Sequence, residues 1–305
     1  MAPELEAFEA HRDLLFGIAY RMLGSAADAD DVLQEARLRW TRDGVAESAR
    51  SPRAVLVTIV TRLCLDQLKS ARARREVYVG PWLPEPLLTG TVPVTSAPPA
   101  PGPIEAAELG DQVSLALLVV LETLSPAERA VFVLREVFGL SAAEVAGALG
   151  RTEAAVRQMA HRAREHVQAR RPRFETDRRI QREVTERFFA ACAGGDVESL
   201  LDALAPDVVL ISDGGGKAKA ALRPITGADK VARFLIGIAA QGATVPDPRI
   251  EIAEVNGAAA VVVWSAGEPF LSVSLEVVDG RIEQVLVVVN PDKLAGLVQP
   301  VAEDT

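Results

Sequence analysis

Side chains that can read DNA bases are spaced to share one face of a helix predicted to begin after Thr152. They stand at positions i, i+1, i+4 and i+5, and they are Arg157, Gln158, His161 and Arg162. Arginine and glutamine can each form two hydrogen bonds with one base edge in the major groove. Arg151 and Arg164 flank the set, where they can hold phosphates. The pattern favours DNA recognition, and a solvated helical hairpin is the alternative.

A second polar group is acidic and predicts a surface for a partner. Its members are Asp28, Asp30, Asp31, Gln34 and Glu35. We expect no metal site here, because successive turns of one helix rarely surround a cation and no histidine is near. A solvated helix face and a binding face for a basic or polar helix both remain open.

Helix signals position both groups. Gly24 suits a helix C-terminus, Ser25 an N-cap with Asp28 three residues later, and Ser51-Pro52 another helix start. Residues 125–128 and 141–144 each read Ser-x-x-Glu, which predicts two capping boxes. The turn at Gly150-Arg151 and the cap at Thr152 then predict a helix-turn-helix.

Charge is distributed unevenly along the 305 residues, whose net charge is −9. Residues 62–75 hold five basic groups against one acid, and residues 151–182 hold ten arginines against four acids. Residues 183–305 instead hold eighteen acids against nine bases. Two basic patches followed by an acidic portion favour a DNA-binding part joined to something else.

The chain from residue 77 onward changes character. Residues 77–104 are expected to be a linker without regular helix, because eight of the nineteen prolines lie between 81 and 103. From about 180, a helix ending at Gly194-Gly195 precedes apolar runs at 208–211, 250–252, 258–264, 270–278 and 282–289, with a hairpin turn at Asp279-Gly280. This order predicts an α+β domain with a curved antiparallel sheet.

Composition excludes other classes. No run of eighteen apolar residues exists and the first residues are acidic, so we expect neither a membrane span nor a secretory signal. Cys64 and Cys192 stand far apart, which fits a reducing cytoplasm and gives no zinc site. We expect no cofactor, no metal and no catalytic residues.

The first half of the chain resembles the extracytoplasmic-function (ECF) sigma factors. Residues 14–40, with Ala19-Tyr20-Arg21 and the run 28–36, look like regions 2.1–2.2 of that family. Residues 63–68 and the arginines after them are similar to regions 2.3–2.4, and residues 121–167 are similar to region 4. The resemblance implies an initiation factor that binds RNA polymerase core and promoter DNA.

The resemblance also assigns roles to residues. The acidic group at 28–35 would grip the clamp coiled coil of the polymerase, and region 4 would contact the flap. The promoter −10 element would be bound by Arg62, Asp66, Lys69, Arg72, Arg74 and Arg75. The −35 element would be read by Arg151, Arg157, Gln158, His161, Arg162 and Arg164.

Three further motifs resemble the SigJ-type group of this family, which carries a SnoaL-like C-terminal domain. The first is Trp82, Leu83, Pro84, Glu85 and Pro86; the second is Asp213, Gly214, Gly215, Gly216 and Lys217; the third is Asn290, Pro291, Asp292, Lys293 and Leu294. The resemblance implies that this domain replaces a separate anti-sigma factor and modulates the sigma domains in cis. We expect the first two motifs to meet.

The expected organisation has four parts: region 2 at 5–76, a linker at 77–104, region 4 at 105–172 and a SnoaL-like domain at 179–298. Two all-α domains therefore precede an α+β cone, in a chain that is monomeric when free. A ligand-sensing helix-turn-helix regulator is the alternative function, and it has no need of the acidic helix and the basic helix after it. Less favoured is an isomerase-like or cyclase-like enzyme, for which Asp207 and Asp213 are candidates by position.

Overall fold

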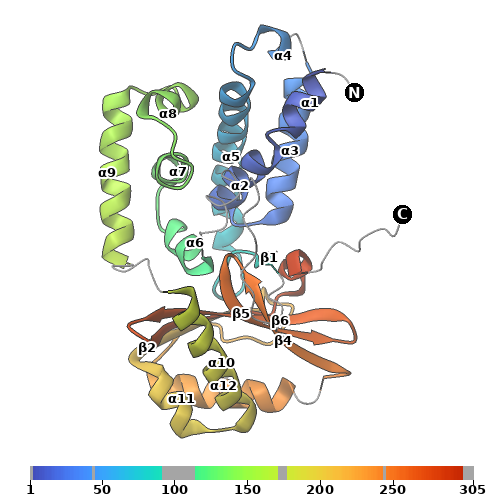
Figure 1. Ribbon diagram of the computed structural model, residues 1–305, viewed down its shortest axis with the longest axis vertical. Helices are drawn as coiled ribbons and strands as arrows, with labels where there is room; N and C mark the ends of the chain where they lie inside the picture. The colour runs from blue at the N-terminus through green and yellow to red at the C-terminus, as the bar shows by residue number, and fades with distance from the viewer. Residues whose placement is uncertain (1–2, 43–44, 91–113, 171–176, 243–244, 298–305) are drawn as a thin grey trace. The chain divides into compact units, whose positions relative to one another are not determined.

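The computed structural model describes residues 3–42, 45–90, 114–170, 177–242 and 245–297 (Figure 1). These residues fall into two compact units. The first unit takes its described residues from 1–77 and 117–172, and the second from 78–100, 114–116 and 173–305. No helix in the described segments is long and apolar enough to cross a membrane.

The first part of unit one is helical, as predicted. Its helices are α1 (Pro3–Glu9), α2 (Arg12–Leu23), α3 (Ala26–Trp40), α4 (Val45–Ser48) and α5 (Pro52–Glu76). Gly24 ends α2 in a left-handed conformation with φ 71°, and the Ser25 hydroxyl accepts the backbone N–H of Asp28 at 3.1 Å. Both caps are confirmed. They bend the chain back so that Trp40 of α3 is 1% exposed.

Region 121–167 forms the expected helix-turn-helix. After α6 (Leu115–Leu121) come α7 (Pro126–Phe132), a π-helical turn η1 (Val133–Val137), α8 (Ala142–Leu149) and α9 (Glu153–Arg170). The capping box at Ser141 and Glu144 is confirmed, and so is the Thr152 cap, whose Oγ1 accepts from Ala155 N at 3.2 Å. Gly150, with φ 62°, makes the turn between the two helices.

The second predicted capping box, at Ser125, was wrong in its reciprocal half. The Ser125 hydroxyl accepts from Glu128 N at 3.4 Å. It also donates to Glu128 Oε2 at 2.6 Å, but the Ser125 backbone N–H does not donate to that carboxylate, so the box is incomplete. The other Glu128 oxygen lies 3.4 Å from Arg162 Nε of α9. That ion pair holds the carboxylate toward α9, so the cap at Ser125 is one-sided.

Unit two is a sheet with helices on one face. The helices are α10 (Arg178–Gly194), α11 (Val197–Ala203) and α12 (Ala228–Gly242). The strands are β1 (Leu88–Gly90), β2 (Leu204–Asp213), β3 (Ile225–Thr226), β4 (Pro248–Val255), β5 (Ala258–Ser265), β6 (Glu268–Val278) and β7 (Arg281–Val288), in the order β1-β4-β5-β6-β7-β2-β3. The three helices lie against the same face of the sheet (Figure 1). An apolar core that includes Phe188, Leu235, Val273 and Val285 fills the space between them.

The expectation of an antiparallel sheet was wrong for one strand pair. β2 and β7 run parallel, with Asp213 opposite Val288. Parallel neighbours require a crossover between them, and here α12 and the β4–β5–β6 meander supply it. No element was predicted at the position of α12, and β1 falls within residues 77–104, which were predicted to be a linker without regular helix. β1 forms one edge of the sheet and pairs with β4.

We expect the two serine caps to differ in stability. Ser141→Ala disrupts a complete capping box and is expected to destabilise α8 by about 1 kcal/mol. Ser125→Ala removes a longer hydrogen bond from a one-sided cap, so it is expected to destabilise α7 by less than that. Amide hydrogen exchange of residues 142–149 and 126–132 measures both. Equal effects on the two helices would contradict this account of the caps.

Candidate functional site

Two of the singled-out motifs leave the sheet side by side. β2 ends at Asp213 and β7 ends at Val288, and parallel strands finish at the same edge. The backbone N–H groups of Val289 and Asn290 continue the pairing, donating to the Asp213 carbonyl at 2.9 and 3.0 Å. The Asp213–Lys217 loop and the Asn290–Leu294 segment are therefore neighbours because of strand pairing, although 77 positions separate Asp213 from Asn290.

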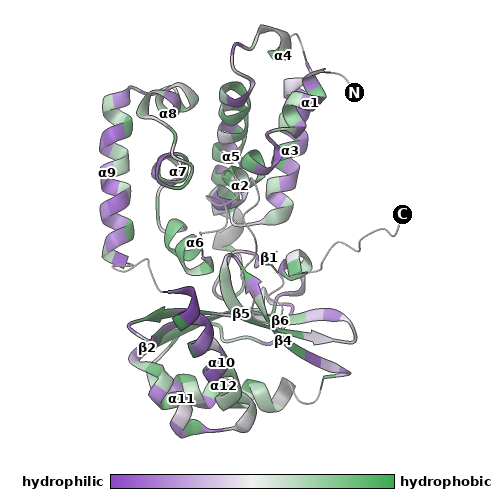
Figure 2. Ribbon diagram, in the orientation of Figure 1, coloured by the Kyte–Doolittle hydropathy of each residue, from purple (hydrophilic) through white to green (hydrophobic). Residues whose placement is uncertain are grey.

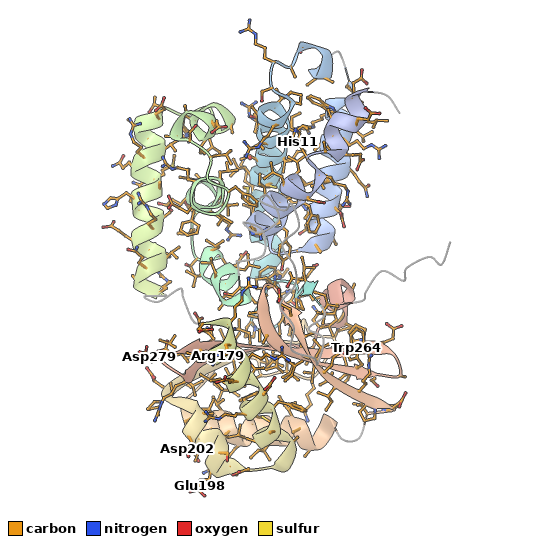
Figure 3. The ribbon with its side chains drawn as sticks, viewed as in Figure 1. His11, Arg179, Glu198, Asp202, Trp264 and Asp279 are labelled. Carbon is orange, nitrogen blue, oxygen red and sulfur yellow. The ribbon has the colours of Figure 1, made fainter. Side chains whose placement is uncertain are left out.

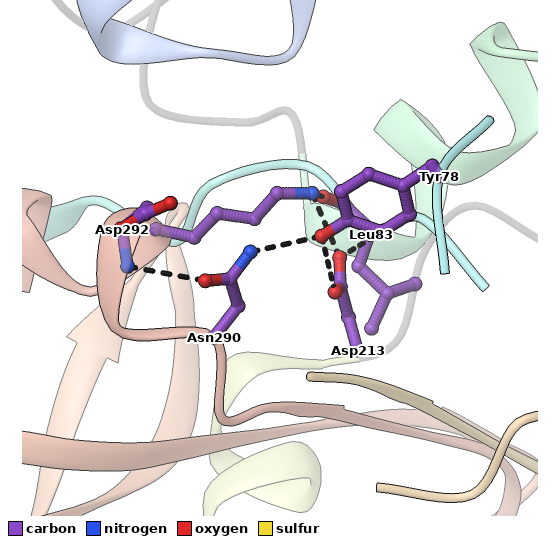
Figure 4. A network of polar contacts seen from close by, with 6 residues as sticks. Tyr78, Leu83, Asp213, Asn290 and Asp292 are labelled. Atoms are coloured by element: carbon purple, nitrogen blue, oxygen red, sulfur yellow. Dashed lines mark hydrogen bonds and ion pairs between the residues drawn. The ribbon is translucent and has the colours of Figure 1, made fainter. Parts of the chain in front are cut away.

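The Asp213 carboxylate binds the linker. It is fully buried, at 0% exposure, and accepts three hydrogen bonds (Figure 4). Tyr78 Oη donates to Oδ1 at 2.6 Å, Leu83 N donates to Oδ2 at 2.8 Å, and Lys293 Nζ donates to Oδ2 at 2.7 Å. We call this network of Tyr78, Leu83, Asp213, Asn290 and Lys293 the clasp.

Lys293 joins all three segments of the clasp. Besides Asp213, its ammonium donates to the Leu83 carbonyl at 2.5 Å. It also lies 4.0 Å from the ring centroid of Trp82 and 5.0 Å from that of Tyr78. Aromatic faces carry negative charge density that attracts a cation, most strongly when water is excluded. One buried charge thus contacts both aromatic residues of the linker.

Because the clasp is buried, its stability depends on the pairing of Asp213 with Lys293. The Lys293 side chain is 7% exposed and that of Asp213 is 0% exposed. An isolated ion in such surroundings is costly, and a buried pair persists only when further hydrogen bonds satisfy both groups. Here Tyr78 and Leu83 complete the carboxylate, and the Leu83 carbonyl and two rings complete the ammonium. The linker is therefore part of the site's charge compensation.

The glycines of the 213–217 loop serve close approach. Gly215 has φ 56°, and a Cβ placed on it would lie 2.3 Å from Asn290 Nδ2 and 2.9 Å from the Tyr78 hydroxyl. Asn290 Nδ2 donates to that hydroxyl at 2.9 Å. Any larger residue at 215 would therefore push into the clasp. This contact explains the glycine better than phosphate binding does.

The linker motif buries its apolar members unevenly. Leu83 is fully buried, Pro84 and Pro86 are buried, and Trp82 and Glu85 are partly exposed. Of the two apolar residues Trp82 and Leu83, which are neighbours in the motif, Leu83 inserts more deeply. The sequence-based prediction did not include Tyr78, whose only signal in the sequence is that it is an aromatic residue four positions before Trp82.

The remaining motif residues lie at the rim of the clasp. Lys217 Nζ lies 2.5 Å from Asp292 Oδ2, and both side chains are more than half exposed. Asp292 N donates to Asn290 Oδ1 at 3.2 Å, which starts the 3-10 turn η2 (Pro291–Lys293). Leu294 is buried, while Pro291 and Gly216 are exposed.

Burial, together with the nearby Asp213 carboxylate, raises the pKa of the Tyr78 phenol well above its ordinary value.

The predicted −35 residues are exposed on or beside α9. The buried side of α9 is formed by Val156, Ala160, Ala163 and Val167, and its remaining surface is largely hydrophilic (Figure 2). The six predicted residues Arg151, Arg157, Gln158, His161, Arg162 and Arg164 are all exposed. Ion pairs at 3.0–3.7 Å join Arg157, Arg162 and Arg164 to glutamates, and His161 Nε2 lies 3.5 Å from Glu165 Oε1. Ion pairs between exposed side chains stabilise little.

The predicted −10 residues lie on α5. Arg62 Nε donates to the Ala148 carbonyl at the end of α8, at 3.2 Å. Asp66 and Lys69 form an exposed pair at 2.8 Å, and this lysine lowers the pKa of Asp66. Arg72, Arg74 and Arg75 belong to the last turns of α5, but their side chains lie outside the described residues.

The acidic group of α3 presents a narrower free surface than the sequence suggests. Asp28 Oδ1 accepts from Gln67 of α5 at 2.8 Å, Asp30 lies 3.5 Å from Arg12, and Glu35 pairs with Arg39 at 2.8 Å. Asp31 and Gln34 are exposed. Sequence reasoning missed Leu38, which follows Gln34 by one turn and is 59% exposed.

A buried arginine joins the two helical parts within unit one. Arg129 of α7 is 3% exposed, and its Nη1 donates to the Met22 carbonyl at 2.8 Å and to Glu122 Oε1 at 2.7 Å. Burial lowers the pKa of this guanidinium to about 10. The Arg21 guanidinium also lies 5.3 Å from the ring centroid of Phe138. Helices α2, α5, α7 and α8 therefore pack together, with polar contacts among apolar ones.

The two carboxylates considered for catalysis are differently placed. Asp207 is exposed on β2. Both oxygens of Asp213 accept hydrogen bonds from the clasp. Within the described segments, no group of three or more His, Cys, Asp and Glu residues could hold a metal ion. Cys64 is buried, and burial raises the pKa of its thiol far above its ordinary value.

Comparison with known proteins gives three family matches. Residues 7–74 match the model of sigma-70 region 2, residues 114–167 that of sigma-70 region 4, and residues 185–285 that of the SnoaL-like domain. The chain is 39% identical over 303 residues to the ECF RNA polymerase sigma factor SigJ of Mycobacterium tuberculosis, with 96% of this chain and 94% of the relative covered. It is 36% identical over 296 residues to the probable ECF RNA polymerase sigma factor SigI of the same organism, covering 96% and 95%.

A solved structure agrees with these matches. The crystal structure of the M. tuberculosis extracytoplasmic-function sigma factor SigJ is 36% identical and has a TM-score of 0.74 to this chain. The match covers 96% of this chain and 98% of that one. The likeness therefore extends over the helical parts and the sheet domain together.

Removing the clasp ammonium is expected to destabilise unit two strongly. Lys293→Met leaves the Asp213 carboxylate buried without its counter-ion, which costs about 3–5 kcal/mol. Lys217→Met breaks the exposed pair with Asp292 and is expected to cost less than about 1 kcal/mol. Urea unfolding followed by tryptophan fluorescence measures both. Similar losses for the two variants would show that the clasp is not the buried charge network described above.

Proposed function

The chain belongs to the ECF RNA polymerase sigma factors, and we propose that its C-terminal SnoaL-like domain controls it by holding the linker between the two sigma regions in the clasp. As a sigma factor it directs RNA polymerase to promoters. The observation that carries the proposal is the buried Lys293–Asp213 pair, to which the linker groups Tyr78 and Leu83 add hydrogen bonds. The linker is covalently continuous with both sigma regions, so its position constrains how they can move.

The polymerase-binding surface that we propose is the exposed stripe of α3. Asp31, Gln34, Glu35 and Leu38 recur at i, i+3, i+4 and i+7, so they share one helix face. Asp28 and Asp30, which are held by Gln67 and Arg12, would then orient the helix more than contact the partner. An exposed leucine beside carboxylates suits a partner helix that is apolar and basic, as we propose for the clamp coiled coil.

Charge reversal tests this surface. Asp31→Lys with Glu35→Lys is expected to abolish retention of the chain by polymerase core in a pull-down, because both charges would repel a basic partner helix. The matched control is Glu198→Lys with Asp202→Lys on α11, also one turn apart and exposed (Figure 3). Retention of the α3 variant at the level of the control would refute the surface.

We also propose that the sigma regions separate before they engage a promoter. The −35 and −10 elements lie about 25 base pairs apart, roughly 85 Å along a duplex at about 3.4 Å per base pair. Yet Arg62, a proposed −10 residue, bonds directly to the last turn of α8 in the helix-turn-helix. The closed packing cannot serve both elements of one straight duplex. Region 4 would bind the −35 element with α9 and approach the polymerase flap once the two regions part.

Arg129 is the residue through which opening can be tested. Arg129→Leu removes the bonds to Met22 and Glu122 at a buried site, so we expect faster amide exchange in α2 and α7 and a higher yield in run-off transcription with polymerase core. Arg157→Leu, an exposed substitution on α9, is the control for packing and should leave exchange in α2 unchanged. Protected α2 amides in the Arg129 variant would count against the closed form.

We propose that the chain acts in the cytoplasm, where its polymerase is, and that it is monomeric before it binds. We propose that the SnoaL-like domain acts by contact and not by catalysis, which the engagement of both Asp213 oxygens supports. A ligand-sensing helix-turn-helix regulator is less favoured, because such a regulator has no need of both sigma-70 region 2 and sigma-70 region 4, which this chain matches.

A further inference from the structure

The hairpin turn between β4 and β5 lies against the linker. Asn256 and Gly257 occupy this turn with φ 52° and 71°, as in the Asn-Gly turns that suit two-residue hairpins. The tip of a hairpin is ordinarily exposed, but Asn256 is only 5% exposed. Asn256 is hydrogen-bonded to the backbone of Leu87, so the linker covers part of this turn.

One residue of the turn satisfies both backbone groups of one linker residue. Leu87 N donates to Asn256 Oδ1 at 3.1 Å, and Asn256 N donates to the Leu87 carbonyl at 2.9 Å. Two residues on, the Thr89 hydroxyl accepts from Gly257 N at 2.8 Å and lies 3.2 Å from Glu254 Oε1. β1 then continues along β4, with Leu88 opposite Val255. The turn therefore recognises two features of the linker: the backbone N–H and C=O of one residue, and a hydroxyl group two residues later.

The last described turn of the domain packs against Leu87 from another side. A Cβ added to Gly296, within η3 (Ala295–Leu297), would lie 2.5 Å from Leu87 Cδ2 and 2.9 Å from the Pro86 carbonyl. Leu87 is thus confined by the turn and by the tail. Position 296 requires a glycine because the Leu87 side chain and the Pro86 carbonyl lie so close to its backbone.

We propose that the Asn256–Gly257 turn and Gly296 form a peptide-binding site whose occupant is the chain's own extended segment Pro86–Thr89. It is a second grip on the linker, separate from the clasp, and its place in regulation rests on the function proposed above. The recognised chemistry is an extended segment that offers a free backbone N–H and C=O at one residue and a hydroxyl two residues later.

The two grips differ in their physical character. The clasp is ionic and buried, whereas the bonds from the turn to Leu87 and Thr89 are neutral and end at the exposed Thr89, whose hydroxyl also donates to the Glu254 carboxylate. Neutral bonds near solvent open more readily than a buried ion pair. The linker therefore detaches first from the turn, while Leu83 stays anchored to Asp213.

Hydrogen exchange on the full chain tests the site. Asn256→Gly keeps a residue that tolerates positive φ but removes the Oδ1 acceptor. The matched control is Ala266→Gly in the β5–β6 turn, where Ala266 has φ 50° and offers no side-chain acceptor. We expect Asn256→Gly to raise amide exchange of Leu87 about fivefold to tenfold, the loss of one hydrogen bond, with the Leu83 amide still protected. The control should leave both amides as they are.

A second variant keeps the test decisive if Asn256→Gly disturbs the turn itself. Thr89→Val removes the acceptor of Gly257 N from the linker side, and it too should speed exchange at Leu87 while β4 and β5 remain protected. Unchanged exchange at Leu87 in both variants overturns the site.

Run-off transcription separates this inference from the function it rests on. If Asn256→Gly frees Leu87 and alters transcript yield, both stand. If it frees Leu87 while neither it nor Lys293→Met alters yield, the binding site stands and regulation by the linker fails.

Discussion

The Asp213–Lys293 pair is the contact on which the arrangement of the C-terminal unit depends. A carboxylate at 0% exposure requires compensation, and the contacts that supply it bring together three places in the chain: the linker, the end of β2 with Asp213 itself, and the segment after β7. Strand pairing accounts for two of the three, because β2 and β7 are parallel and end together. The third, the part of the linker around Tyr78 and Leu83, lies outside the strands. Its position is fixed by charge and by hydrogen bonds to Leu83.

This constraint connects the local chemistry to the proposed regulation. Taking the linker away would expose the ammonium and carboxylate to partial hydration, and keeping it there closes the pair against water. Any event that shifts the equilibrium between bound and released linker, such as polymerase binding to the sigma regions on either side of it, would change the surroundings of Lys293. Coupling of this kind is reciprocal, so the state of the clasp would alter how readily the sigma regions move apart.

Much of the fold could be predicted from local signals, because they act within a few residues. Gly24, Ser25, Ser141, Gly150 and Thr152 each end or begin a helix through their own backbone or hydroxyl. What could not be predicted depends on distant partners. The parallel pairing of β2 with β7, the role of Tyr78 and the grip of Asn256 on Leu87 all join positions more than 70 residues apart. The glycines of the 213–217 loop were visible in the sequence, but only the position of Asn290 explains Gly215. Motif resemblance named Trp82 and Leu83 alike, and packing shows Leu83 to be the more deeply buried of the two.

Run-off transcription by polymerase core with Asp213→Asn tests the central claim most directly, because this change removes one charge from the clasp with almost no change in shape. Asp292→Asn at the exposed rim is its control, since it carries the same substitution 2.5 Å from Lys217 and outside the buried pair. The account predicts that Asp213→Asn changes promoter-specific transcript yield several-fold at equal polymerase binding, while Asp292→Asn matches the unaltered chain. Equal yields from all three proteins would contradict control through the clasp.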